Sequence, residues 1–176
     1  NLVKTLHILG DYETALDISK ATVAKLRPSE HVKLLADALI EQAEVLKRQG
    51  TLVVADKLVQ EAIDLLTPLD DKTSLVYAYD RMSDLKYEQG DYENAQKFAG
   101  QGLAMAKEVA DNFRMGSLLT NLGQVAYATG KYDVALTHWS EAREIHIPRG
   151  QRREVALLEM NMGAIAGQNG DLETCL

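Results

Sequence analysis

The heptapeptide GKYDVAL, residues 130–136, recurs with variations along this chain of 176 residues. Related segments begin at forty-residue intervals: GDYETAL (10–16), GTLVVAD (50–56), GDYENAQ (90–96) and GDLETCL (170–176). No insertion or deletion interrupts this period, and each glycine is followed five positions later by a small residue: Ala15, Ala55, Ala95, Ala135 and Cys175. A fixed period of this length is typical of a solenoid, in which each unit buries its apolar face against its neighbours.

Each period predicts two antiparallel helices. In the clearest unit the first helix covers 112–129, with an apolar stripe through Leu118, Leu122 and Val125, and the second covers 132–147. Gly130 is well placed to adopt the left-handed backbone conformation just past the end of the first helix. Pro148 should end the second helix. Further helices are expected near 11–26, 30–49, 51–66, 72–89, 91–109 and 151–169, with truncated ones at 1–9 and from 171 on. Strand-type alternation is lacking.

These patterns predict an all-α, right-handed superhelical solenoid, with residues 1–176 as one domain. The first and last repeats are truncated, so we expect the chain to be part of a larger protein. The unfinished first unit would leave apolar residues such as Leu2, Leu6 and Leu9 uncovered, and self-association through the ends is therefore possible.

Composition narrows the function. The net charge of −7 argues against general affinity for nucleic acids or anionic membranes, and no apolar run approaches a membrane span. A single cysteine forms no intramolecular disulfide, and His7, His31, His138 and His146 form no metal-ligand pattern. Signatures of hydrolases, nucleotide-binding loops and kinases are missing. We expect a cytoplasmic, non-catalytic protein with neither metal nor cofactor.

The chain resembles the tetratricopeptide repeat (TPR) family over its whole length. The residues that carry the resemblance are Leu122-Gly123, Gly130-Lys131-Tyr132, Ala135 and Trp139. The repeat unit is forty residues long instead of the usual thirty-four. Units of this length resemble those of kinesin light chain, spindle-orientation adaptors, bacterial peptide-pheromone receptors and the sensor regions of large bacterial signal-transducing ATPases. Leu119 replaces the early tryptophan of the family pattern.

The resemblance implies that the first helix of each unit lines a concave groove. Its groove-facing columns include Glu41, Arg81, Asn121 and Asn161. The residues expected to contact a protein or peptide partner are Tyr77, Arg81, Tyr87, Asn121, Gln124, Tyr127 and Asn161, with Glu41, Glu44 and Asp84 favouring basic residues of the ligand. The amide groups of Asn121 and Asn161 would bond a ligand backbone; the alternative is that they are simply solvated.

Three further features have competing interpretations. Some TPR proteins bind chaperone C-termini through a carboxylate clamp, but acids at 41, 44, 80 and 84 occupy the required positions, so we reject that function. A basic cluster (His146, Arg143, Arg149, Arg152 and Arg153) is either a site for an acidic partner or a solvated loop. Gly100 and Gly102 lie inside a predicted helix, and we attribute both to close helix approach instead of a phosphate loop.

The predicted function is therefore a protein-interaction module that holds a protein or peptide segment in its groove. The alternative is a ligand- or peptide-sensing domain of a larger, bacterial-type signalling or transcription regulator, in which binding alters the superhelix. One scaffold serves many roles, so the sequence does not identify the partner.

Overall fold

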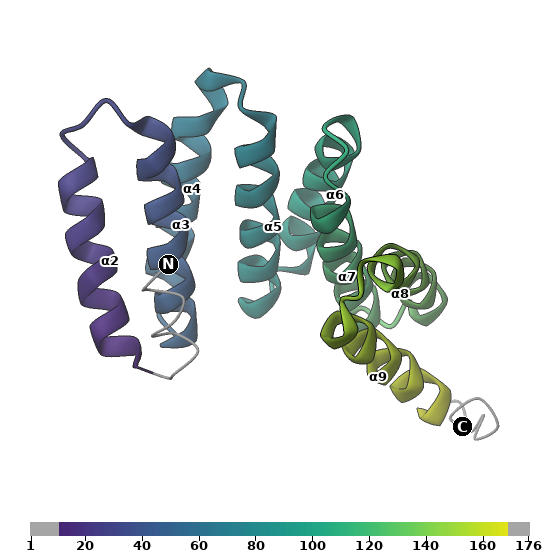
Figure 1. Ribbon diagram of the computed structural model, residues 1–176. Helices are drawn as coiled ribbons and strands as arrows, with labels where there is room; N and C mark the ends of the chain where they lie inside the picture. Colours follow the sequence, from purple (N-terminus) through teal and green to yellow (C-terminus); the bar gives the residue numbers. More distant parts are fainter. Residues whose placement is uncertain (1–10, 169–176) are drawn as a thin grey trace.

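The computed structural model describes residues 11–168. Over that range it contains eight α-helices and two short 3₁₀ helices, and no strand (Figure 1). The helices are α2 (Tyr12–Leu26), α3 (Val32–Arg48), α4 (Leu52–Leu66), α5 (Lys72–Glu88), α6 (Tyr92–Glu108), α7 (Asn112–Ala128), α8 (Tyr132–His146) and α9 (Arg152–Gln168), with 3₁₀ helices at Thr67–Leu69 and Ile147–Arg149. The bounds confirm the predicted helices to within two residues at each end. The expected helices at 1–9 and from 171 on lie outside the described residues.

The helices pack as successive antiparallel pairs in a right-handed superhelical solenoid. Helices α3, α5 and α7 are the first members of their pairs, and α4, α6 and α8 are the second members. First helices of neighbouring units also contact one another directly, α3 with α5 and α5 with α7. In Figure 1 the helices from α2 to α5 stand side by side, whereas α7 to α9 are rotated away from them. The first helices thereby share one face of the molecule.

The repeated glycine turns explain how each pair is closed. Gly130 has a φ of +74°, and an added Cβ would meet nothing within 4 Å, so the residue is needed for its backbone conformation and not for space. Its N–H bonds to the carbonyl of Tyr127 at 3.0 Å, and the N–H of Lys131 bonds to the carbonyl of Ala126 at 2.8 Å. These two bonds form a Schellman motif, which satisfies carbonyls at the helix end.

Small residues let the paired helices approach closely. Ala95 and Ala135 are fully buried, as the repeat pattern predicts. Trp139 is 2% exposed and donates its indole N–H to the carbonyl of Thr120, while its ring lies against Gly123, where any side chain would collide with it.

The two glycines inside α6 differ in their surroundings. An added Cβ at Gly102 would lie 2.9 Å from Leu118, which confirms a close helix contact at this position. The same interpretation is wrong for Gly100, which is exposed and where an added Cβ would have no neighbour within 4 Å. Among residues 11–168, no helix is long and apolar enough to cross a membrane.

Candidate binding groove

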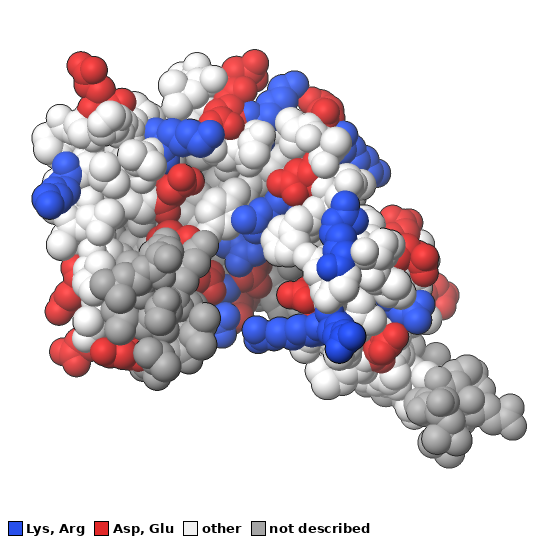
Figure 2. All heavy atoms as spheres, viewed as in Figure 1, with Lys and Arg blue, Asp and Glu red and all other residues white. Residues whose placement is uncertain are grey.

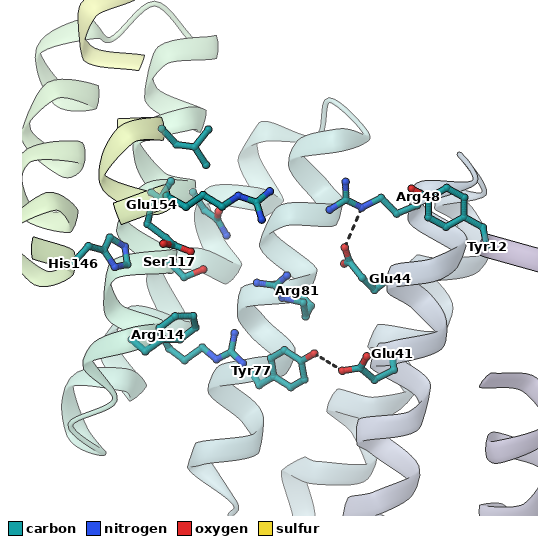
Figure 3. Close-up of a pocket in the computed structure, with 15 residues that line it drawn as sticks. Tyr12, Glu41, Glu44, Arg48, Tyr77, Arg81, Arg114, Ser117, His146 and Glu154 are labelled. Atoms are coloured by element: carbon teal, nitrogen blue, oxygen red, sulfur yellow. Dashed lines mark hydrogen bonds and ion pairs between the residues drawn. The ribbon is translucent and has the colours of Figure 1, made fainter. Parts of the chain in front are cut away.

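A groove with a volume of about 760 Å³ opens on the face shared by the first helices. Figure 2 shows lysine and arginine side chains around the hollow in the middle of the molecule, with acidic side chains beside them. Figure 3 shows that the groove side chains come mainly from α3, α5, α7 and α9. The lining residues are Tyr12, Glu41, Glu44, Arg48, Tyr77, Arg81, Phe113, Arg114, Ser117, Thr120, Asn121, His146, Arg153, Glu154 and Leu157.

A buried carboxylate, Asp80, organises the groove floor. Its side chain is fully buried, and its Oδ1 accepts hydrogen bonds from Ser117 Oγ at 2.8 Å and Asn121 Nδ2 at 3.2 Å. Its Oδ2 accepts from Arg81 Nη2 at 2.6 Å and Arg114 Nη1 at 3.0 Å. Buried charge is costly unless it is paired and hydrogen-bonded, and these four donors meet that requirement. Two guanidinium groups share this one carboxylate, so Asp80 alone neutralises only one of them.

A row of three side chains crosses the groove from α7 to α3 (Figure 3). The guanidinium carbon of Arg114 lies 4.2 Å from the centroid of the Tyr77 ring, within the range of a cation–π contact. The Tyr77 hydroxyl donates to Glu41 Oε1 at 3.1 Å. Burial, followed by the charge of Glu41, raises the pKa of Tyr77, so its hydroxyl keeps its proton and remains a donor.

The acidic side chains on α3 are compensated by neighbouring cations. Glu44 lies 3.2 Å from Lys47 Nζ and 3.4 Å from Arg48 Nε, and Lys47 also contacts Asp84. Burial tends to raise the pKa of Glu44, but the charges of Lys47, Arg81 and Arg48 outweigh it and hold the pKa below its ordinary value.

The charge of Arg81 is balanced in the same way. Burial lowers the pKa of this guanidinium, but Asp80, Asp84 and Glu44 more than offset that effect, so Arg81 stays cationic. The carboxylate clamp was rejected because acids occupy positions 41, 44, 80 and 84, and the structure keeps acids at all four. Glu44, Asp80 and Asp84 contact cations there.

Five of the ten predicted contact residues line the groove: Glu41, Glu44, Tyr77, Arg81 and Asn121. The other five (Asp84, Tyr87, Gln124, Tyr127 and Asn161) are partly buried and lie outside the lining set.

The tyrosines outside the groove pack on other aromatic rings. The ring centroid of Tyr87 lies 5.6 Å from that of Tyr92. Tyr127 packs between Tyr132 and Trp139, at 5.5 Å and 5.8 Å. Each therefore already has an aromatic neighbour within the solenoid.

Asn121 has an internal role that the sequence did not reveal. It is 8% exposed, and its amide nitrogen donates to both the carboxylate and the backbone carbonyl of Asp80. Contact with a ligand backbone would therefore use the amide oxygen of Asn121. The side chain of Asn161, on α9, has no hydrogen-bond partner among residues 11–168.

Arg114 and His146 were missed for different reasons. Arg114 belongs to a column of residues forty positions apart, which also contains Leu34, Ser74 and Glu154. This column lies one helical turn before the columns from which the groove residues were predicted. Adding one more turn to those columns would have included Arg114. His146 comes from a second helix and is 2% exposed. It reaches the groove because Gly116 has no side chain: an added Cβ there would lie 2.5 Å from His146 Cε1. The ring is held through Nδ1, which contacts Gln151 Oε1.

The basic cluster around Pro148 is divided in the structure. Arg143 Nε lies 3.1 Å from Glu159 Oε1, and Arg149 donates to the carbonyl of Ile145 at 3.0 Å. Arg152 and Arg153 are both exposed, but only Arg153 lines the groove. Within the part of the chain that the structure describes, no group of three or more His, Cys, Asp or Glu residues is placed to hold a metal ion.

Solved structures share this architecture at low sequence identity. BtubC (BKLC) from P. vanneervenii matches with a TM-score of 0.83 and 17% identity, over 99% of this chain and 72% of that one. A Rap protein complexed with competence and sporulation factor matches with a TM-score of 0.87 and 17% identity, over 98% of this chain and 48% of that one. A signal transduction ATPase with a tetratricopeptide repeat sensor, from Pyrococcus horikoshii, matches with a TM-score of 0.82 and 16% identity, over 99% of this chain and 26% of that one.

These likenesses establish the fold, and the chain spans less than half of the last two proteins. No curated protein sequence matches the chain. The model of the MalT-like TPR region, in contrast, matches residues 1–165. The chain therefore belongs to the MalT-like TPR family.

Proposed function

We propose that this domain binds an extended protein or peptide segment in the concave groove. The observation that carries the proposal is a groove of about 760 Å³ with side chains from four successive first helices. Packed helices lie roughly 8–10 Å apart, so three intervals span about 24–30 Å. An extended chain covers about 3.3 Å per residue, and the groove therefore accommodates about seven to nine residues of such a ligand.

The lining chemistry suits a peptide. Arginine groups offer donors for carbonyl and carboxylate oxygens, and glutamate groups offer acceptors for backbone N–H groups. Phe113 and Leu157 are 44% and 46% exposed, which leaves two large apolar side chains available in the groove. Burying such side chains against a ligand is favourable, at about 25 cal/mol per Å² of apolar surface.

A sensor role is the second candidate, and the Asp80 network favours it. This network ties α5 to α7 through Arg114, Ser117 and Asn121, all of which line the groove. A ligand that contacts these side chains would bias the angle between two successive units. Small-angle scattering with and without the ligand separates the candidates, because a pure docking module keeps the same superhelix.

Selection from a displayed library of random twelve-residue peptides tests the proposed function. Selected peptides, resynthesised with a fluorophore, would be titrated with the parent domain, Phe113→Ala and Val53→Ala. Val53 is the matched control, since it is also apolar and is 68% exposed on the second helix α4. We expect Phe113→Ala to weaken binding about tenfold and Val53→Ala to leave it unchanged. Failure to select any peptide, or equal losses in the two variants, would contradict the groove proposal.

A further inference from the structure

We infer that the groove contains a subsite for the primary carboxamide of an asparagine or glutamine side chain of the ligand. The subsite surrounds Gly116 and consists of three side chains that line the groove: Ser117 and Thr120 on α7, and His146 on α8. In Figure 3, Ser117 and His146 lie at the same end of the groove. The inference rests on the proposed function and specifies which type of residue the groove selects.

The pair formed by Gly116 and His146 departs from the repeat pattern. The equivalent positions in the other units, forty residues apart, hold Ala36, Val76 and Ala156 in place of the glycine, and Leu26, Leu66 and Ala106 in place of the histidine. The ring of His146 lies over Gly116, where an added Cβ would be 2.6 Å from Nε2. Apolar residues fill the same positions in the other units, so packing alone does not account for a buried imidazole in this one.

The second ring nitrogen of His146 is a hydrogen-bond acceptor. The side chain is 2% exposed, and its Nδ1 contacts the amide oxygen of Gln151. An amide oxygen only accepts hydrogen bonds, so Nδ1 carries the proton of the neutral ring and Nε2 carries a lone pair. Nε2 has no hydrogen-bond partner among residues 11–168. Within that range the enclosed side-chain atoms without a partner belong to Asp56, Arg81 and His138, so Nε2 is open to the groove.

The two hydroxyl groups beside this nitrogen have already used their hydrogen atoms. Ser117 Oγ donates to Asp80 Oδ1 at 2.8 Å, and Thr120 Oγ1 donates to the carbonyl of Gly116 at 2.9 Å. A hydroxyl group has one donor and two acceptor lone pairs, so both groups offer only lone pairs to a ligand. The subsite therefore presents acceptors from three side chains and no free donor.

A ligand group with two donors fits these acceptors. Among uncharged side chains, only asparagine and glutamine carry two N–H donors on one atom. The carbonyl oxygen of such a group also finds a donor in the groove. Arg114 lies one helical turn before Ser117, lines the groove, and has N–H groups beyond the one that bonds to Asp80.

The charges at this end of the groove favour a neutral group. Asp84 and Glu44 contribute to balancing Arg81, so Asp80 remains as the counter-charge of Arg114. The other charged residues that line this end are Arg153 and Glu154, which are neighbours on α9 and have opposite charges. These charges cancel, and the subsite therefore selects its ligand by hydrogen bonding and not by charge.

Five blocked dipeptides and nuclear magnetic resonance of the ¹⁵N-labelled domain test the subsite. Each has an N-acetyl group, a phenylalanine, a variable second residue and a C-terminal N-methylamide, so only the second side chain can supply a primary carboxamide. The second residues are glutamine, asparagine, glutamate, lysine and glutamine with a dimethylated side-chain nitrogen. Glutamine or asparagine should bind about tenfold more tightly than the last three and should shift the ¹⁵N signal of His146 Nε2. The tighter of the two identifies the preferred side chain.

Thr120→Val and Thr137→Val form a matched pair. Both hydroxyl groups donate to the carbonyl four residues earlier at 2.9 Å, but Thr120 lines the groove, whereas Thr137 is exposed on α8 outside the lining set. We expect Thr120→Val to weaken binding of the carboxamide dipeptide about three- to tenfold and Thr137→Val to leave it unchanged. His146→Asn, which removes Nε2, should weaken binding in the same way; if that variant does not fold, the threonine pair still decides.

Several results would overturn the subsite and leave the proposed function intact. One is equal binding of the carboxamide dipeptides and of the glutamate, lysine or dimethylated ones. Another is no binding of any dipeptide while library-selected peptides still bind the groove. Equal losses in Thr120→Val and Thr137→Val would also overturn it. Absence of any groove ligand in both experiments would overturn the proposed function itself.

Discussion

Replacing Asp80 by asparagine tests whether one buried carboxylate holds the groove together. The substitution keeps the shape of the side chain but removes its charge and turns one acceptor oxygen into an N–H₂ donor. That donor would face either the pair Ser117 and Asn121 or the two arginines, all of which donate to Asp80. The variant therefore loses hydrogen bonds and leaves Arg81 and Arg114 without their shared counter-charge.

The expected loss follows from burial. Removing one partner of a fully buried ion pair costs about 3–5 kcal/mol. Asp80 is fully buried, but Arg81 and Arg114 keep 25% and 22% of their side chains exposed, so water screens part of the uncompensated charge. We expect the free energy of unfolding to fall by about 2–3 kcal/mol.

Urea denaturation, followed by circular dichroism and by Trp139 fluorescence, measures this loss. Repeat proteins can unfold in stages, so the two signals must coincide before a single free energy is used. Asp84→Asn is the control, because Asp84 also pairs with a cation but is 24% exposed, and we expect it to cost at most about 1 kcal/mol. Equal losses in the two variants would refute the central role of Asp80.

Three further predictions concern packing and pH. Gly116→Ala should cost about 1–3 kcal/mol, because its Cβ would press against His146, whereas Gly100→Ala, in an open helical position, should stabilise by about 0.5–1 kcal/mol; denaturation midpoints that move alike would contradict this. Ala135→Leu should also lower the free energy of unfolding, by about 1–3 kcal/mol, and so lower the denaturation midpoint. An unchanged midpoint would be inconsistent with the complete burial of Ala135. The pKa of Glu44 is lower in the folded state than its ordinary value of 4.5, so its contribution to the free energy of unfolding is present above that value and is lost as pH falls through the folded pKa. Glu44→Gln should therefore flatten the dependence of the free energy of unfolding on pH below pH 4.5. An identical dependence in parent and variant would count against the Lys47 and Arg48 contacts.

The fold was predictable because its signals are local and repeated. Gly130 marks a helix end through its own backbone conformation, and Ala135 marks a helix contact through its size. Both signals recur every forty residues, so each unit supports the assignment of the others. Gly100 was misinterpreted because a glycine in a helix does not reveal whether another helix faces it.

The sequence predicted groove residues only where equivalent positions of successive repeats lie on the same face of their helices. The helix register placed Tyr77, Arg81 and Asn121 on the face that carries the groove. It gave no sign that Asp80 is buried, because that depends on donors 34 to 41 residues later in the chain. A charged residue next to a groove position therefore resembles a surface charge until its partners are placed in three dimensions.

The claim that the concave face binds the ligand is tested most directly with a spin-labelled peptide. A peptide selected from the library would carry a nitroxide at its centre, and the resulting line broadening would be measured for each backbone amide of the domain. We predict strong broadening along α5 and α7, around Tyr77, Ser117 and Asn121. Exposed positions of the second helices, such as Val53 and Gln101, should show little effect. Strong broadening on α4 and α6 with sharp signals on α5 and α7 would contradict it.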